Sequence, residues 1–177
     1  MESLPTSVPR PNATDVAAVR AALGREPTVP FDVVVRSEAG APVVLRNAPL
    51  TRGGDPMPTR YWLVDPELVR AVARLEAAGG VRAAAAAVDG AAVADAHARY
   101  AAERDAAIAA DWTGPRPHGG VGGTRRGVKC LHAHYAWFLA GGDDPVGRWV
   151  DAELRAAATP TTTTTATAPA IPRKDVP

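Results

Sequence analysis

The chain has 177 residues, of which 46% are hydrophobic and 22% charged, and its formal net charge is +1 at pH 7. These values are typical of one globular domain, and the near-neutral charge argues against a dedicated nucleic-acid-binding protein. The single cysteine excludes an internal disulfide, and no apolar run approaches the roughly 20 residues that span a bilayer. We therefore expect a cytoplasmic protein without membrane insertion.

The first part of the chain predicts a flexible lead followed by a short helix. Residues 1–12 are rich in proline and polar residues, so we expect this lead to be flexible. Val16, Val19 and Leu23 then recur at helical spacing, and Gly24 is placed to end the helix.

Three short segments rich in branched or aromatic residues predict strands, namely Phe31 to Arg36, Val43 to Arg46 and Thr59 to Val64. Turn residues between the first two segments predict a hairpin. In the third segment, strand alternation places Tyr61 and Trp62 on opposite faces.

Helical patterns dominate the rest of the chain. They predict helices over Glu67 to Ala78, Ala91 to Ala110, Gly127 to Ala140 and Pro145 to Ala158. The alanine-rich residues Val81 to Val88 either extend a helical hairpin or fray.

These elements predict a single α+β domain over residues 13–158, with a small antiparallel sheet of about three strands packed against four or five helices. The helix over Ala91 to Ala110 has a thin apolar stripe, so we expect it to be exposed or to face a protein partner. Residues 159–177 are rich in Thr, Ala and Pro and should form a disordered tail.

The stretch from Gly114 to Gly147 holds the candidate functional residues. A glycine-rich loop followed by a basic helix start suits an anion such as phosphate, because free amides, the helix dipole and positive side chains meet there. The residues predicted to bind the anion are Gly122, Gly123, Thr124, Arg125, Arg126 and Lys129, with Arg46 and Arg60 adding charge from the sheet. The alternative is a linker whose arginines face water.

The same stretch carries the only cysteine, Cys130, together with His132 and His134. A regular helix would place Cys130 and His134 on one face and His132 roughly opposite, whereas an extended chain would turn all three the same way. On the helical interpretation, a zinc ion would take Cys130 and His134 and borrow His118 as a third ligand. The alternative is a buried cysteine and structural histidines.

Cys130 and His134 are also the residues that we predict for nucleophilic catalysis. Lys129 precedes the thiol and the imidazole follows one turn later, and positive neighbours favour the reactive thiolate. A cysteine and a histidine one turn apart are, in the alternative, only neighbours on a helix.

Three runs carry a resemblance to a known family: FDVVVRSEAGAPVVLRNAPL, GDPMPTRYWLVDPELVRAVARLEAAGGV and GVGGTRRGVKCLHAHYAWFLAGGDDPVG. Over roughly Ala13 to Leu154 the chain resembles the family of domain of unknown function 501, found mainly in high-GC Gram-positive bacteria. The family has no established activity. Its members are often encoded beside a septum-formation-initiator-like protein and an exopolyphosphatase, so the resemblance implies phosphate chemistry or a division-linked role.

Three functional hypotheses follow. The first is a protein that binds a phosphate-bearing or other anionic small molecule. The second is a metal-assisted or thiol-dependent hydrolase centred on Cys130 and His134. The third is a non-enzymatic interaction module linked to cell division, with the Ala91 to Ala110 helix as its partner surface. The sequence leaves open whether the protein is an enzyme.

Overall fold

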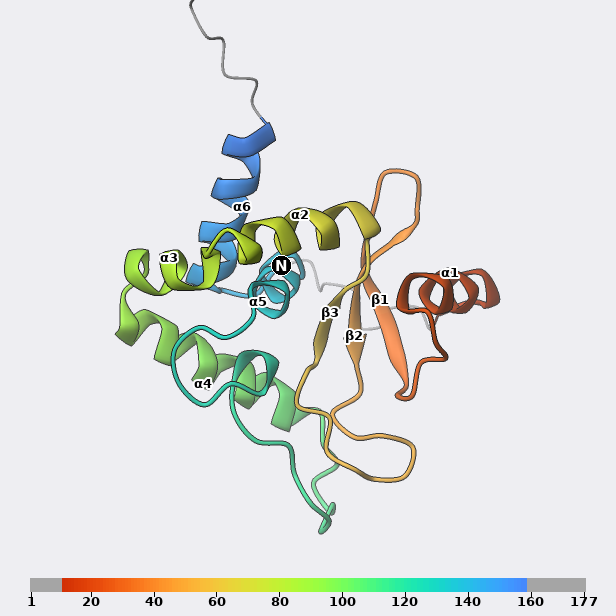
Figure 1. The fold of residues 1–177 in the computed structure, drawn as a ribbon. Coiled ribbons are helices and arrows are strands. Elements are labelled where there is room, and N and C mark those ends of the chain that lie inside the picture. Colours follow the sequence, from red (N-terminus) through yellow and green to blue (C-terminus); the bar gives the residue numbers. More distant parts are fainter. Residues whose placement is uncertain (1–10, 159–177) are drawn as a thin grey trace, which may run out of the picture.

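The computed structural model describes residues 11–158, which form a three-stranded antiparallel sheet and six α-helices (Figure 1). This confirms the α+β class and the small sheet. Six helices are present where four or five were expected, and residues 80–87 form a helix of their own rather than fraying. Residues 1–10 of the lead expected over residues 1–12, and the tail expected over residues 159–177, lie outside the described residues.

The sheet has the order β1-β2-β3, with β2 in the centre. Its strands are β1 Phe31–Arg36, β2 Pro42–Asn47 and β3 Tyr61–Leu63. The expected alternation in β3 is confirmed. Tyr61 belongs to the larger apolar core on one face of the sheet, and Trp62 packs against the smaller apolar core on the other face.

Helix α1, Ala13–Leu23, covers the smaller core. A capping box starts it, because the Asn12 side chain accepts from the Asp15 amide and the Asp15 side chain accepts from the Asn12 amide. Arg36 at the end of β1 donates to both carboxylate oxygens of Asp15, at 2.7 and 2.9 Å. This bidentate pair holds the pKa of Asp15 below its ordinary value and fixes α1 on the sheet.

The remaining helices lie on the opposite face of the sheet (Figure 1). They are α2 Pro66–Ala77, α3 Gly80–Ala87, α4 Gly90–Ala106, α5 Leu131–Leu139 and α6 Pro145–Ala158. Helix α5 lies between β3 and α6, and Gly147 allows α6 to approach it, since a Cβ there would lie 2.4 Å from the Phe138 Cβ. Within residues 11–158, no helix combines the length and apolar character that crossing a bilayer requires.

Helix α4 is shorter than the expected Ala91 to Ala110 segment, and its apolar stripe is buried. Val93 and Tyr100 on α4, and Ile108 just after its end, are only 3%, 1% and 7% exposed. Part of the cover comes from the glycine segment, which we define as residues 119–123, because a Cβ at Gly120 would lie 2.3 Å from the Cβ of His97 on α4. The stripe expected to face a partner therefore packs inside this chain.

Arg104 on α4 anchors the segment that leads into these glycines. Its side chain is 2% exposed, and its guanidinium donates to Gly119 O at 2.7 Å and Pro117 O at 3.3 Å. Asp105 pairs with its Nε at 2.8 Å. A buried charge is tolerated when it is paired and hydrogen-bonded in this way.

Replacing Arg104 with methionine should lower the free energy of unfolding by about 2 kcal/mol or more, because two carbonyls lose their donor. The matched control is Arg99→Met, on the same helix, whose 3.2 Å ion pair with Asp143 is exposed and whose loss should cost less than about 1 kcal/mol. Urea denaturation measures both values. Equal losses in the two variants would contradict the anchoring role.

Candidate functional site

The glycine segment is an internal structural loop. Gly120 N donates to Thr124 O at 2.8 Å, and Val121 N donates to His97 Nδ1 at 3.1 Å. These amides are satisfied within the fold and are not free to meet an anion.

The anion site expected at Gly122, Gly123 and Thr124 does not have its expected geometry. Residues Val121–Gly123 form a short 3-10 turn, and the amides of Gly123 and Thr124 donate to carbonyls of that same turn. The next α-helix begins only at Leu131. The helix start that supported the prediction is therefore absent from the loop, and the amides of Gly123 and Thr124 are already hydrogen-bonded.

The basic residues predicted for this site do not converge. Arg125, Arg126 and Lys129 are exposed, and within residues 11–158 none of them makes a hydrogen bond or an ion pair. Arg46 and Arg60 line a cavity beside the sheet that none of the other three lines.

Helix α5 begins at Leu131 and not at the expected Gly127. Gly127 has a φ of +65°, and Cys130 is extended, with φ −142° and ψ 114°. Cys130 therefore stands one residue before the helix and not inside it. This break places Cys130 close to His132, whereas the regular helix expected from the sequence would have placed it with His134.

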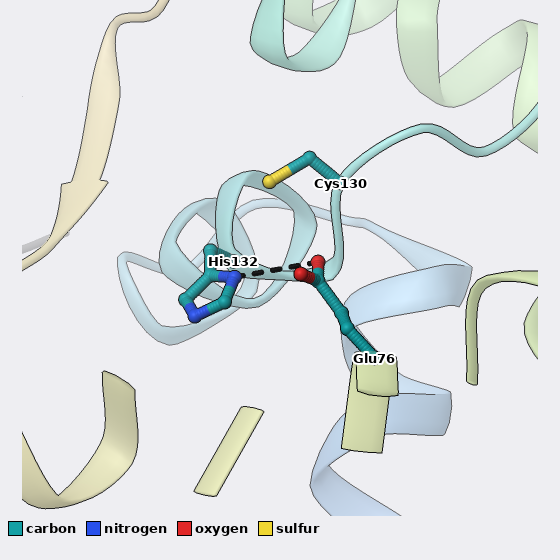
Figure 2. Close-up of side chains that lie close together, drawn as sticks. All are labelled: Glu76, Cys130 and His132. Atoms are coloured by element: carbon teal, nitrogen blue, oxygen red, sulfur yellow. Dashed lines mark ion pairs between the residues drawn. The ribbon is translucent and has the colours of Figure 1, made fainter. Parts of the chain in front are cut away.

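Glu76 completes a cluster with these two residues, which we call the Glu76 cluster (Figure 2). Glu76 lies in the last turn of α2, and its Oε1 accepts a hydrogen bond from the Leu131 amide at 2.6 Å. The carboxylate oxygen, the Cys130 Sγ and a His132 ring nitrogen all lie within 4.8 Å of one another. All three residues are half-buried, so water and small solutes can reach them.

The hydrogen bonds of His132 determine its orientation. Nε2 lies 3.1 Å from Val69 O, and because a carbonyl only accepts, Nε2 carries a hydrogen. Nδ1 lies 3.3 Å from Glu76 Oε1 and faces the cluster. Contact with the Cys130 sulfur, the Val69 carbonyl and the Glu76 charge raise the pKa of His132 to about 9, against an opposing effect of burial.

His134 lies in a separate, closed polar pair. Its ring is 1% exposed, and its Nδ1 lies 2.7 Å from Asp144, which is fully buried and accepts from the amides of Val146 and Gly147. His118, the expected third metal ligand, is exposed. The structure does not unite Cys130 with His134 and His118, because within residues 11–158 the group with metal-ligand spacing is the Glu76 cluster.

The donor set of the Glu76 cluster suits two kinds of chemistry. Thiolate, imidazole and carboxylate groups are the three side-chain ligands that zinc takes in proteins. A thiol beside an imidazole is also the basic unit of cysteine nucleophiles. In the metal site Glu76 would be the carboxylate ligand, and it is a residue that was not predicted from the sequence.

Glu76 was not predicted from the sequence, and His132 was expected on the side of the helix away from Cys130. The spacing of Cys130 and His132 was a usable signal, because residues two apart share a side when the chain is extended. Glu76 gave no such signal, since it lies 55 residues before the Leu131 amide that it binds.

A family model described as "Protein of unknown function (DUF501)" matches residues 33–152. The chain belongs to this family. The DUF501 match contains the whole Glu76 cluster and begins within β1, so α1 lies outside it. Searches of curated proteins and of solved structures found no match.

The raised pKa of His132 predicts how stability depends on pH in metal-free protein. The ordinary pKa is 6.5 and the folded value is about 9, so protonation of His132 stabilises the fold fully below pH 6.5, and this contribution is lost as pH rises through 9. Urea denaturation of the chain and of His132→Gln should give a stability difference that is largest at the acidic end and shrinks toward pH 9. A stability difference between the two proteins that stays constant or grows with pH would contradict a His132 imidazole that is protonated and ion-paired in the folded protein.

Proposed function

We propose that this protein binds a divalent transition-metal ion, with zinc the best fit, through Glu76, Cys130 and His132. The orientation of His132 carries the proposal. Because Nε2–H donates to Val69 O, the lone pair of a neutral ring is at Nδ1, which faces the other two donors. Metal-binding histidines are typically oriented by such a hydrogen bond from the second ring nitrogen to a carbonyl or carboxylate.

The mixed donor set selects among metals. Mg²⁺ and Ca²⁺ prefer oxygen ligands, so a thiolate and an imidazole disfavour them. Zinc accepts sulfur, nitrogen and oxygen together, usually in tetrahedral geometry. His132 Nδ1 and Glu76 Oε1 lie 3.3 Å apart, close to the separation of two ligands that are each about 2.0–2.1 Å from a tetrahedral zinc ion.

Three protein ligands leave one coordination position for water or a substrate. Catalytic zinc sites have this arrangement, and zinc lowers the pKa of its bound water to about 7. The reaction class that we propose is accordingly metal-assisted hydrolysis. The half-buried position of the cluster supports access of water to the open position.

Protein expressed without a histidine tag should contain close to one zinc per chain by elemental analysis. Cys130→Ala and His132→Ala should each lose the metal, because outer-shell changes alone cost about 10–100-fold in affinity and these changes remove ligands. His118→Ala is the matched control and should keep it, since His118 is exposed and lies outside the cluster.

Replacement of zinc by Co²⁺ gives a second readout. A thiolate ligand should produce a near-ultraviolet sulfur-to-cobalt charge-transfer band in the chain and in His118→Ala, but not in Cys130→Ala. Metal content that is absent, or that survives both Cys130→Ala and His132→Ala, would contradict the proposal.

Thiol catalysis at Cys130 is the second candidate, supported by the contact between the thiol and the His132 ring. A protonated imidazole stabilises a neighbouring thiolate, and Val69 O holds the ring in place. This arrangement differs from a standard triad, because Glu76 lies at the same ring nitrogen that faces the thiol. The difference favours the metal over the triad.

Alkylation of Cys130 by iodoacetamide separates the two candidates. In metal-free protein, His132→Gln should slow alkylation several-fold at neutral pH, because the thiolate loses its cationic partner. Saturating Zn²⁺ should protect the thiol in the wild-type chain. Alkylation that is unaffected by zinc would favour thiol chemistry over the metal centre.

The anion-binding and interaction-module hypotheses receive less support at the residues that the sequence predicted for them. In the glycine segment, the amides of Gly120, Val121 and Gly123 are hydrogen-bonded within the fold, which leaves no run of consecutive free amides for an anion. For the interaction module, Val16 is the one large apolar side chain that is exposed within residues 11–158, and it lies on α1, not on α4.

A further inference from the structure

A cavity of about 660 Å³ lies at one end of the sheet, apart from the Glu76 cluster. Its walls come from the segment between α1 and β1, the end of β2 and the loop between β2 and β3. The hydrogen bond from Ala48 N to Pro30 O, at 2.8 Å, joins two of these walls. Small-molecule sites in proteins typically have about 300–1,000 Å³, so the cavity has ligand size.

Three arginines and two acidic residues line this cavity, and the acidic residues already have partners. Asp32 pairs with Arg46 at 3.1 Å, and Glu26 pairs with Arg20, which lies outside the lining, at 2.8 Å. The other two guanidinium groups of the lining belong to Arg52 and Arg60.

Arg60 is held in place at the cavity wall. Its side chain is 11% exposed and its guanidinium donates to Asn47 O at 3.1 Å. Its Nε is buried and forms an ion pair with Glu103 Oε1 at 3.6 Å. A guanidinium has several N–H donors, so an anion in the cavity would bind the accessible part of this group and not Nε.

Arg52 supplies the second positive group from the β2–β3 loop. It is exposed, and across residues 11–158 it makes no hydrogen bond or ion pair. Arg60 is fixed by the fold and Arg52 is free to move, so together they can clamp an oxyanion through charge-assisted hydrogen bonds.

Part of the lining is apolar. It includes Val16, Val29 and Phe31, with prolines between them. Val16 is 36% exposed and is the one large apolar side chain exposed in the described part of the chain. An apolar lining with a few fixed polar groups is the usual composition of a small-molecule site.

We propose that this cavity binds a small organic anion, with a phosphate or carboxylate group at Arg52 and Arg60 and an apolar body against Val16, Val29 and Phe31. This site is independent of the metal centre, because no residue of the Glu76 cluster lines the cavity. It places an anion-binding function at Arg60, one of the residues singled out in the sequence, but away from the glycine segment.

Isothermal titration of the full chain with 1-naphthyl phosphate, 1-naphthoate and neutral 1-naphthol tests the proposal. At least one of the two anions should bind saturably, and 1-naphthol should bind about ten-fold or more weakly because it lacks the charge-assisted contacts. Tighter binding of the phosphate assigns the site to organic phosphates, and tighter binding of the carboxylate assigns it to carboxylates. Inorganic phosphate alone should bind weakly, since it lacks the apolar body.

Variants locate the site. Arg52→Gln, an exposed position that leaves the fold intact, and Arg60→Gln should each weaken anion binding about ten-fold. Arg126→Gln removes the same charge from an exposed position outside the cavity and should have no effect. Cys130→Ser should also bind like the wild type, so a failure of the metal proposal leaves this result unchanged.

Three outcomes overturn the proposal. One is the absence of saturable binding of both anions at millimolar concentrations. Another is unchanged binding in Arg52→Gln. The third is a loss in Arg126→Gln equal to that in Arg52→Gln, which would locate the anion near the glycine segment or assign the effect to overall charge.

Discussion

The carboxylate of Glu76 accepts a hydrogen bond from the Leu131 amide at 2.6 Å, and the candidate site depends on this contact. Leu131 N is in the first turn of α5, where amides have no partner within the helix. A carboxylate satisfies such an amide and interacts favourably with the helix dipole. Because Glu76 ends α2, the same bond joins two helices and lets α5 begin after Cys130, which brings the thiol and His132 to the carboxylate.

A second carboxylate–histidine pair, Asp144 and His134, is too buried to bind a solute. Asp144 caps α6 through the amides of Val146 and Gly147 and holds His134 at 2.7 Å, but the pair is sealed in the interior. The Nε2 of His134 is buried and has no hydrogen-bond partner within residues 11–158. No solute reaches this pair without opening the core. The Glu76 cluster uses the same kind of carboxylate–helix contact at a half-buried position, with a thiol added.

Local patterns in the sequence were sufficient for most of the fold. The branched strand segments and the alternation of Tyr61 and Trp62 are local signals, and the structure follows them. The candidate site was harder to predict, because it depends on a contact between Glu76 and Leu131 that is distant in the chain. The helix was expected to start at Gly127, which would include Cys130 and place it near His134. In the structure the helix starts at Leu131, so Cys130 lies before it and close to His132. Burial of α4 was missed for a similar reason, since its cover comes from the later glycine segment.

We propose two independent sites in one small domain. One is a metal centre between α2 and α5, and the other is an anion-binding cavity at one end of the sheet. In the metal centre, His132 would bind the metal through Nδ1 while Nε2–H donates to Val69 O. A crystal structure of the zinc-loaded protein, with anomalous scattering measured at the zinc edge, tests this most directly. We predict one peak about 2.0–2.1 Å from His132 Nδ1 and about 2.3 Å from Cys130 Sγ, with Glu76 as the third protein ligand. A peak at another position, or coordination of His132 through Nε2, would contradict the account.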